Sequence, residues 1–107
     1  MKNGIRSCSM LGAAILMVCT GGFAQSPAEA LYKAKCQNCH GSDGMTHSGV
    51  SQSMKVKPVN DPDVKKLSEP EMIEIVRRGS GRMQPYKGEL TDAQIKGAVQ
   101  YFRSFIK

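Results

Sequence analysis

A five-residue motif, Cys36-Gln37-Asn38-Cys39-His40, limits what this chain can fold into more than any other feature of the sequence. It places two thiols three positions apart and an imidazole directly after the second thiol. Such a group is typical of a redox dithiol, of part of a zinc site, or of the point where a haem is bonded to the chain. Each of these needs a different surrounding structure, so the rest of the sequence decides between them.

The N-terminal segment, residues 1–24, has the order of a secretory signal peptide. Two basic residues stand near its start, residues 10–19 form an uncharged and largely apolar run, and residues 20–24 are small and weakly polar. The sequence predicts cleavage after Ala24 and export of residues 25–107 to the bacterial periplasm. An uncleaved N-terminal anchor is the alternative, although the apolar run is much shorter than the about 20 residues that a membrane-spanning helix needs.

Cleavage would leave few means of stabilising the exported domain. It would remove Cys8 and Cys19, so that Cys36 and Cys39 remain. A disulfide between these two would close a very small loop and stabilise little. Small exported domains usually need a disulfide, a metal or a cofactor, because their hydrophobic cores are small. The chain has no tryptophan, and we expect something other than ordinary side chains to fill its centre.

Caps and apolar spacing predict three main helices and no strands. The helices are expected at residues 25–41, 68–79 and 91–106, with a short helical turn at 61–67. The second and third helices begin with capping boxes, at Ser68 and Thr91. Segments 41–59 and 79–88 have the composition of loops. Because long structureless loops in compact domains usually have a function, both segments are expected to be functional rather than simple connections.

A covalently attached haem accounts best for the motif in this setting. Cys36 and Cys39 would hold two vinyl groups at one edge of the porphyrin, and His40 would lie beneath the ring as an axial ligand of the iron. A dithiol of the thioredoxin type would need a strand before its first cysteine. A zinc site would have to draw on Cys36, Cys39, His40 and His47. The adjacent Cys39 and His40 would then strain the tetrahedron. We therefore expect one haem c with iron.

The second axial ligand has five candidates in the exported domain: Met45, His47, Met54, Met72 and Met83. Met72 lies on the apolar side of its predicted helix and is expected to belong to the core. Met45 and His47 follow His40 too closely to reach the other face of the ring. Met83 lies in a stretch where glycines let the backbone approach a flat ligand and Pro85 stiffens the chain. We favour Met83 as the distal ligand and keep Met54 as the alternative.

The order of these features resembles the small single-haem class I cytochromes c of bacteria over essentially the whole exported domain. The stretch from Leu31 to Gly41 is similar to the first helix and attachment site of that family, and Arg82-Met83-Gln84-Pro85-Tyr86 is similar to its distal-ligand loop. In many members proline follows the methionine directly, whereas Gln84 intervenes here. The resemblance implies an all-α, cytochrome c-like fold with three main helices wrapped around one covalently attached haem.

The resemblance also implies two particular contacts. The first and last helices would cross, and the facing residues would be Ala28 and Tyr32 on one side and Ala98, Tyr101 and Phe102 on the other. A proline carbonyl, best matched by Pro58, would accept the N–H of His40 and make the imidazole a better donor to the iron.

An iron with both axial positions filled favours electron transfer over catalysis. Substrates or oxygen then bind only if a ligand is lost, so the sequence predicts a one-electron carrier that is not an enzyme. The alternative is a haem-bearing subunit or gas-sensing domain of a larger redox complex. The net charge of +6 suits fast, weak encounters with redox partner proteins that have acidic docking surfaces, or else only keeps the surface solvated. No nucleic-acid partner and no small-molecule substrate are expected.

Overall fold

The computed structural model describes residues 25–107. The predicted signal peptide lies outside this part. The described chain forms six helices: α1 (Pro27–Lys35), α2 (Gln37–His40), α3 (Gly49–Ser53), α4 (Pro62–Lys65), α5 (Glu69–Arg78) and α6 (Asp92–Arg103). Isolated bridges pair Ser80 with Met83 and Lys87 with Leu90, but residues 25–107 contain no strand. None of the helices in this range is long and apolar enough to cross a membrane.

The three longest helices begin at side-chain caps that the sequence indicates. The hydroxyl of Ser26 accepts the backbone N–H of Glu29 at the start of α1, over 3.1 Å. Complete capping boxes open α5 at Ser68 and α6 at Thr91, as predicted. Each cap satisfies backbone N–H groups that have no partner inside the helix, and this fixes where the helix starts.

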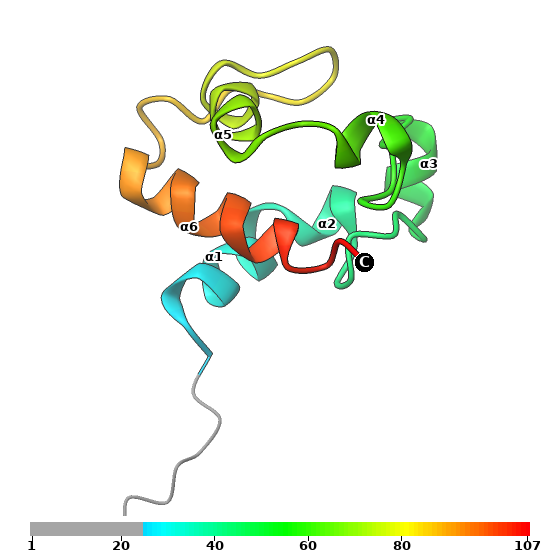
Figure 1. The fold of residues 1–107 in the computed structure, drawn as a ribbon, viewed down its shortest axis with the longest axis horizontal. Helices are drawn as coiled ribbons and strands as arrows, with labels where there is room; N and C mark the ends of the chain where they lie inside the picture. Colours follow the sequence, from blue (N-terminus) through cyan, green and yellow to red (C-terminus); the bar gives the residue numbers. More distant parts are fainter. Residues whose placement is uncertain (1–24) are drawn as a thin grey trace, which may run out of the picture.

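The helices are arranged in two layers. Figure 1 shows α1, α2 and α6 in one layer, with α5 and the long loop that follows it in the other. Helix α6 packs against both α1 and α5 and so joins the layers. At one end of the molecule the C-terminus reaches the segment before α4, where the backbone N–H of Lys107 donates to the side-chain oxygen of Asn60 over 3.2 Å.

The expected contact between the first and last helices is present. A Cβ atom on Gly97 of α6 would lie 3.4 Å from the Cβ of Ala28, so the two helices approach closely at this point. Further along, the ring of Tyr32 lies 5.1 Å from that of Tyr101 and 6.4 Å from that of Phe102, between centroids. Phe105 completes the group at 5.6 Å. Tyr32 is only 1 % exposed, and it therefore anchors the crossing.

Three boundaries differ from the sequence prediction. The first helix is broken at Cys36, whose φ of −115° and ψ of −37° separate α1 from α2. Segment 41–59 is not entirely loop, because it contains α3. The last helix ends at Arg103, so that Phe105 and Ile106 pack from the chain beyond it. In each case tertiary contacts determine the backbone conformation, and the local spacing of apolar residues does not reveal such contacts.

The ordinary core is small, as the composition suggests. Its central cluster consists of Met72, Tyr86, Ile95 and Val99. Met72 is 5 % exposed, which agrees with its predicted place in the core. This cluster lies where α5 and the loop after it meet α6, and all of its members except Ile95 line the cavity described next.

Candidate functional site

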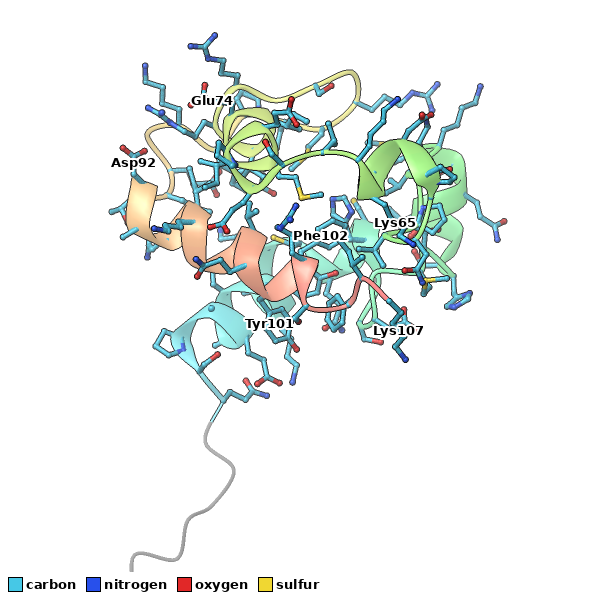
Figure 2. The ribbon with its side chains drawn as sticks, viewed as in Figure 1. Lys65, Glu74, Asp92, Tyr101, Phe102 and Lys107 are labelled. Carbon is cyan, nitrogen blue, oxygen red and sulfur yellow. The ribbon has the colours of Figure 1, made fainter. Side chains whose placement is uncertain are left out.

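An apolar cavity of about 280 Å³ lies between the two layers. Its apolar wall comes from the segments around α4, α5 and α6, and includes Val56, Val64, Leu67, Ile75, Val76 and Leu90. Figure 2 shows Phe102 extending from α6 toward the space between the layers, while Tyr101 lies on the side of the helix that faces α1. Phe102 lines the cavity together with Tyr32 of α1.

A second cavity, of about 520 Å³, continues from the first toward the surface. The two share six lining residues: Cys36, His40, Val56, Ser80, Met83 and Tyr86. Cys39 lines only the outer cavity. Together the cavities form one slot, with an apolar interior at the first and a mouth lined by exposed polar and charged side chains at the second. Their combined size falls within the range of about 300–1,000 Å³ that is usual for pockets that hold cofactors.

The break between α1 and α2 places the three motif residues at this slot. Cys36 occupies the break itself, and its backbone N–H donates to Tyr32 over 2.8 Å. Cys39 and His40 follow on α2, which ends at Gly41 with a φ of 87°. Both cysteines are free thiols and half-buried. The structure thus brings Cys36, Cys39 and His40 together at one side of the slot.

The environment of the thiols does not suit a redox dithiol. Burial, and to a lesser extent the neighbouring Cys39, raises the pKa of the Cys36 thiol to about 11. Reactive dithiols instead need a first cysteine with a lowered pKa, because the thiolate is the nucleophile. No strand precedes Cys36 within the described residues. Both observations favour cysteines that serve as attachment points.

The imidazole of His40 faces an apolar environment and is held as a neutral ring. Burial lowers its pKa, so the ring carries no charge near neutral pH. Its Nδ1 atom is buried and has no hydrogen-bond partner among the described residues. The ring of Phe102 stands edge-on at 5.2 Å between centroids. A neutral imidazole without competing hydrogen bonds is suited to bind a metal through its free lone pair.

The expected hydrogen bond from His40 to Pro58 is absent. The Pro58 carbonyl instead accepts the backbone N–H of Asp61, over 2.9 Å, in the turn that leads into α4. Segment 41–59 folds against α2 through α3, and this places Pro58 at the turn. The proline matched by sequence order is therefore not the partner of this imidazole.

Met83 reaches the slot from the opposite layer. It lies in the loop after α5, where its N–H donates to Ser80 over 2.8 Å and its carbonyl accepts from Ser80 over 3.1 Å. Gly79, with a φ of 76°, lets this loop fold back: a Cβ there would lie 2.7 Å from the carbonyl oxygen of Met83 and 2.9 Å from the nitrogen of Pro85. Met83 and His40 both line the two cavities, from segments that lie in opposite layers.

The other candidate ligands occupy less suitable positions. Met54 lines the outer cavity but not the inner one. The sulfur of Met45 accepts a hydrogen bond from Asn60 over 3.4 Å. His47 is 79 % exposed and stands 3.8 Å from Asp43. Within residues 25–107, no three His, Cys, Asp or Glu side chains gather as a metal site, so the zinc alternative has no ligand set there.

Three functional contacts were missed by reasoning from the sequence. The hydroxyl of Ser51 donates to the carbonyl of Cys39, and Arg82 donates to the carbonyl of Ser53 over 2.6 Å. The hydroxyl of Tyr86 donates to the carbonyl of Lys35 over 3.1 Å. Each bond ends on a backbone carbonyl, which every residue has, so no sequence pattern marks its acceptor. Only Tyr86 could have been suspected from the sequence, because it is an aromatic residue close to Met83 in the same loop.

The residues present fit a covalently attached haem. The slot is apolar, as a porphyrin requires, and two thiols stand at its rim. The imidazole of His40 and the thioethers of Met72 and Met83 line its interior, and the sulfur of Met72 also accepts a hydrogen bond from Arg103 over 3.7 Å. Imidazole and thioether are the side chains that ligate iron in low-spin haem proteins. The small ordinary core agrees with a group that completes the centre of the fold.

Comparisons with known proteins lead to the same class. A family model described as cytochrome c oxidase, cbb3-type, subunit III matches residues 24–102. A solved structure, the c-type cytochrome KustC0563, superposes with a TM-score of 0.68 at 29 % sequence identity, covering 75 % of this chain and 98 % of that one. A comparison with curated proteins found no match. Because the family match spans most of the chain and the helical fold agrees, the protein belongs to this family of c-type cytochromes, with haem c as its covalently attached, iron-containing group.

Proposed function

We propose that this c-type cytochrome is an exported one-electron carrier with a six-coordinate iron. Cys36 and Cys39 hold the haem through thioether bonds, His40 is the proximal axial ligand, and Met83 is the distal one. The observation that carries the proposal is that His40 and Met83 line the same apolar cavity from opposite layers of the fold. Met54 reaches only the outer cavity, which supports Met83 over Met54.

The haem supplies a metal centre that accepts and releases one electron, with a potential raised by a thioether ligand and an apolar setting. The residues around the haem limit the iron to electron transfer. Two side chains occupy the axial positions, so a substrate has no place to bind. Phe102 and the aliphatic wall give the interior of the slot an apolar lining. The outer cavity leaves the cysteine side near the surface, where a partner protein can approach closely.

Denaturation tests the covalent attachment. Haem should remain with the unfolded chain in acid and organic solvent, and the spectrum in alkaline pyridine should report two thioether bonds. Replacement of Cys36 and Cys39 together by alanine should release all haem. Haem that is extracted from the unmodified protein would contradict the proposal at its first step.

Carbon monoxide tests the axial ligands. The reduced protein should show no spectral change with carbon monoxide, because both axial positions are occupied. Met83→Ala should bind it rapidly, whereas Met54→Ala, the matched control, should behave like the unmodified protein. If Met54→Ala opens the iron and Met83→Ala does not, Met54 is the distal ligand.

Export is part of the proposal and rests on the pattern in residues 1–24. The protein recovered from the periplasm of a Gram-negative host should have the mass of a chain that begins at Gln25 plus one haem. A mass that still includes the first 24 residues would favour the uncleaved anchor.

A second candidate function comes from the family itself, whose description names a subunit of an oxidase. The protein would then carry electrons as a haem-bearing subunit of a larger redox complex. Gentle extraction from its own cell, followed by size separation and haem detection, distinguishes the two functions. Haem at the mass of the single chain supports the free carrier, and haem at a much larger mass supports the subunit.

A further inference from the structure

A buried serine stands directly behind the attachment motif. Ser51 in α3 is 1 % exposed and is the one polar side chain that is buried among residues 25–107. Its hydroxyl donates to the carbonyl of Cys39, the residue that precedes His40. A buried hydroxyl is stable only if it is hydrogen-bonded, so this bond fixes the position of both groups.

A second serine contacts the first. The hydroxyls of Ser48 and Ser51 lie 2.8 Å apart, and Ser48 also accepts the backbone N–H of Ser51 over 3.0 Å. Each hydroxyl has one hydrogen to donate. Because the hydrogen of Ser51 points at Cys39, Ser51 can only accept from Ser48. The Ser48 hydroxyl lies within hydrogen-bond distance of two acceptors, the hydroxyl of Ser51 at 2.8 Å and the Asn38 carbonyl at 3.3 Å, so Ser48 contacts both Ser51 and the backbone of α2.

Helix α2 needs such support because it is very short. It has four residues, Gln37–His40, and the last carbonyls of a helix have no partner within it. Segment 41–59 supplies both partners: Ser51 binds the Cys39 carbonyl, and the N–H of Thr46 donates to the His40 carbonyl over 3.2 Å. The peptide groups on both sides of the His40 Cα are thus held from outside α2.

We propose that Ser51 is a positioning residue for the axial imidazole. It fixes the peptide plane between Cys39 and His40, and through it the angle at which the imidazole enters the slot. Since the ring lacks the expected bond to Pro58, its orientation depends on the backbone and on contact with Phe102. This inference rests on the proposed role of His40 as proximal ligand.

The test compares Ser51→Ala with Ser53→Ala in the haem-loaded protein. Ser53 is in the same short helix, but it is exposed and donates to Val50, over 3.1 Å, so it serves as a matched control. In the oxidised protein the proton shifts of the four haem methyl groups depend on the orientation of the axial imidazole. Ser51→Ala should change their spread or order, and Ser53→Ala should leave them as in the unmodified protein.

Amide hydrogen exchange gives a second readout. The N–H groups of His40 and Gly41 hold α2 together by bonding to Cys36 and Gln37. In Ser51→Ala they should exchange about tenfold faster, the factor that corresponds to the loss of one hydrogen bond. An unchanged methyl pattern together with unchanged exchange would overturn the proposal, as would equal changes in both variants.

A third variant keeps the test decisive if Ser51→Ala does not accumulate with haem. Ser48→Ala removes the hydroxyl that contacts Ser51, caps α3 and reaches the Asn38 carbonyl, but it keeps the hydroxyl that binds Cys39, so it should change the methyl shifts in the same direction by a smaller amount. No change in Ser48→Ala, or a larger change than in Ser51→Ala, overturns the proposal. The same samples are tested for haem extraction and for carbon monoxide binding. If the proposed function is wrong, the unmodified protein will release its haem or bind carbon monoxide, and neither result depends on Ser51.

Discussion

Gly79 shows how one residue without a side chain places Met83, the proposed distal ligand, four positions away. Its φ of 76° and ψ of 167° belong to a region that only glycine adopts readily. A Cβ there would also lie 2.7 Å from the Met83 carbonyl oxygen. The turn therefore needs glycine both for its backbone angles and for the space above it.

Replacement of Gly79 by alanine should destabilise the protein and loosen Met83. The expected loss in the free energy of unfolding is at least about 3 kcal/mol, from backbone strain and the close contact combined. Gly81→Ala is the matched control: its φ is also positive, at 55°, but nothing lies within 4 Å of its Cβ position, so about 1 kcal/mol is expected. Denaturant titration measures both, and equal losses would contradict the explanation.

Tyr32 joins the helix crossing to the attachment segment. Its hydroxyl donates to the Gly41 carbonyl over 2.6 Å, and Tyr32→Phe should cost about 1–2 kcal/mol because the buried carbonyl loses its partner. Burial also raises the pKa of the phenol. The unfolded phenol ionises near pH 10 while the folded one stays protonated, so stability should fall as the pH rises above that value.

The alkaline part of this prediction is checked by measuring stability between about pH 9 and 11. Tyr32→Phe should have a shallower decline than the unmodified protein. Tyr101→Phe, from the same aromatic group, removes a neighbour that contributes less than burial to the raised pKa of Tyr32, and it should keep most of the decline. Parallel curves for all three proteins would rule out Tyr32 as the source.

At the level of elements, the sequence predicts the capped helices well and the segment between α2 and α4 poorly. Ser68 and Thr91 are local signals, because cap and helix are neighbours in the chain. Helix α3, with the sequence Gly-Val-Ser-Gln-Ser, has a low intrinsic helix propensity. It forms in contact with α2, through Ser51 twelve positions away from its acceptor. No local pattern records such a contact.

The same segment is linked to the distal loop by Arg82. Arg82 directly precedes Met83 in the chain, and its guanidinium donates to the Ser53 carbonyl over 2.6 Å. Arg82→Gln should free this side of the loop, so that the reduced protein binds carbon monoxide several-fold faster. Arg78→Gln controls for charge, because Arg78 pairs with Glu74, over 3.0 Å, and should leave the rate unchanged. Equal rates in the two variants would show that the link does not restrain Met83.

For the whole molecule, the fold class and the presence of a covalently attached haem were predictable for a chemical reason. Covalent attachment demands a fixed spacing of Cys36, Cys39 and His40, and that spacing is visible in the sequence. The small number of core residues then indicates that a bound group fills the centre. What could not be predicted is which side chains close the slot, because Tyr86 and Phe102 meet it through the packing of α5 on α6. The implied Pro58 contact failed for the same reason.

The last prediction follows from the distribution of charge over the molecule. Three cations line the outer cavity, namely Lys35, Lys55 and Arg82, and no carboxylate does. Lys35 pairs with Glu89 over 3.1 Å, whereas Lys55 has no ion-pair partner among the described residues. An acidic redox partner that docks over the mouth would therefore meet Lys55 directly.

Lys55→Glu should slow electron transfer to an acidic redox protein by roughly fivefold at low ionic strength, because it replaces an attraction with a repulsion at the point of closest approach. The difference should shrink as salt is added, since exposed charges are screened. Lys96→Glu makes the same change of charge on α6, outside the residues that line the mouth, and should have a much smaller effect. Stopped-flow rates at several ionic strengths decide between local docking and net charge: if the two variants slow transfer equally, the positive surface acts through its total charge and the mouth is not the docking site.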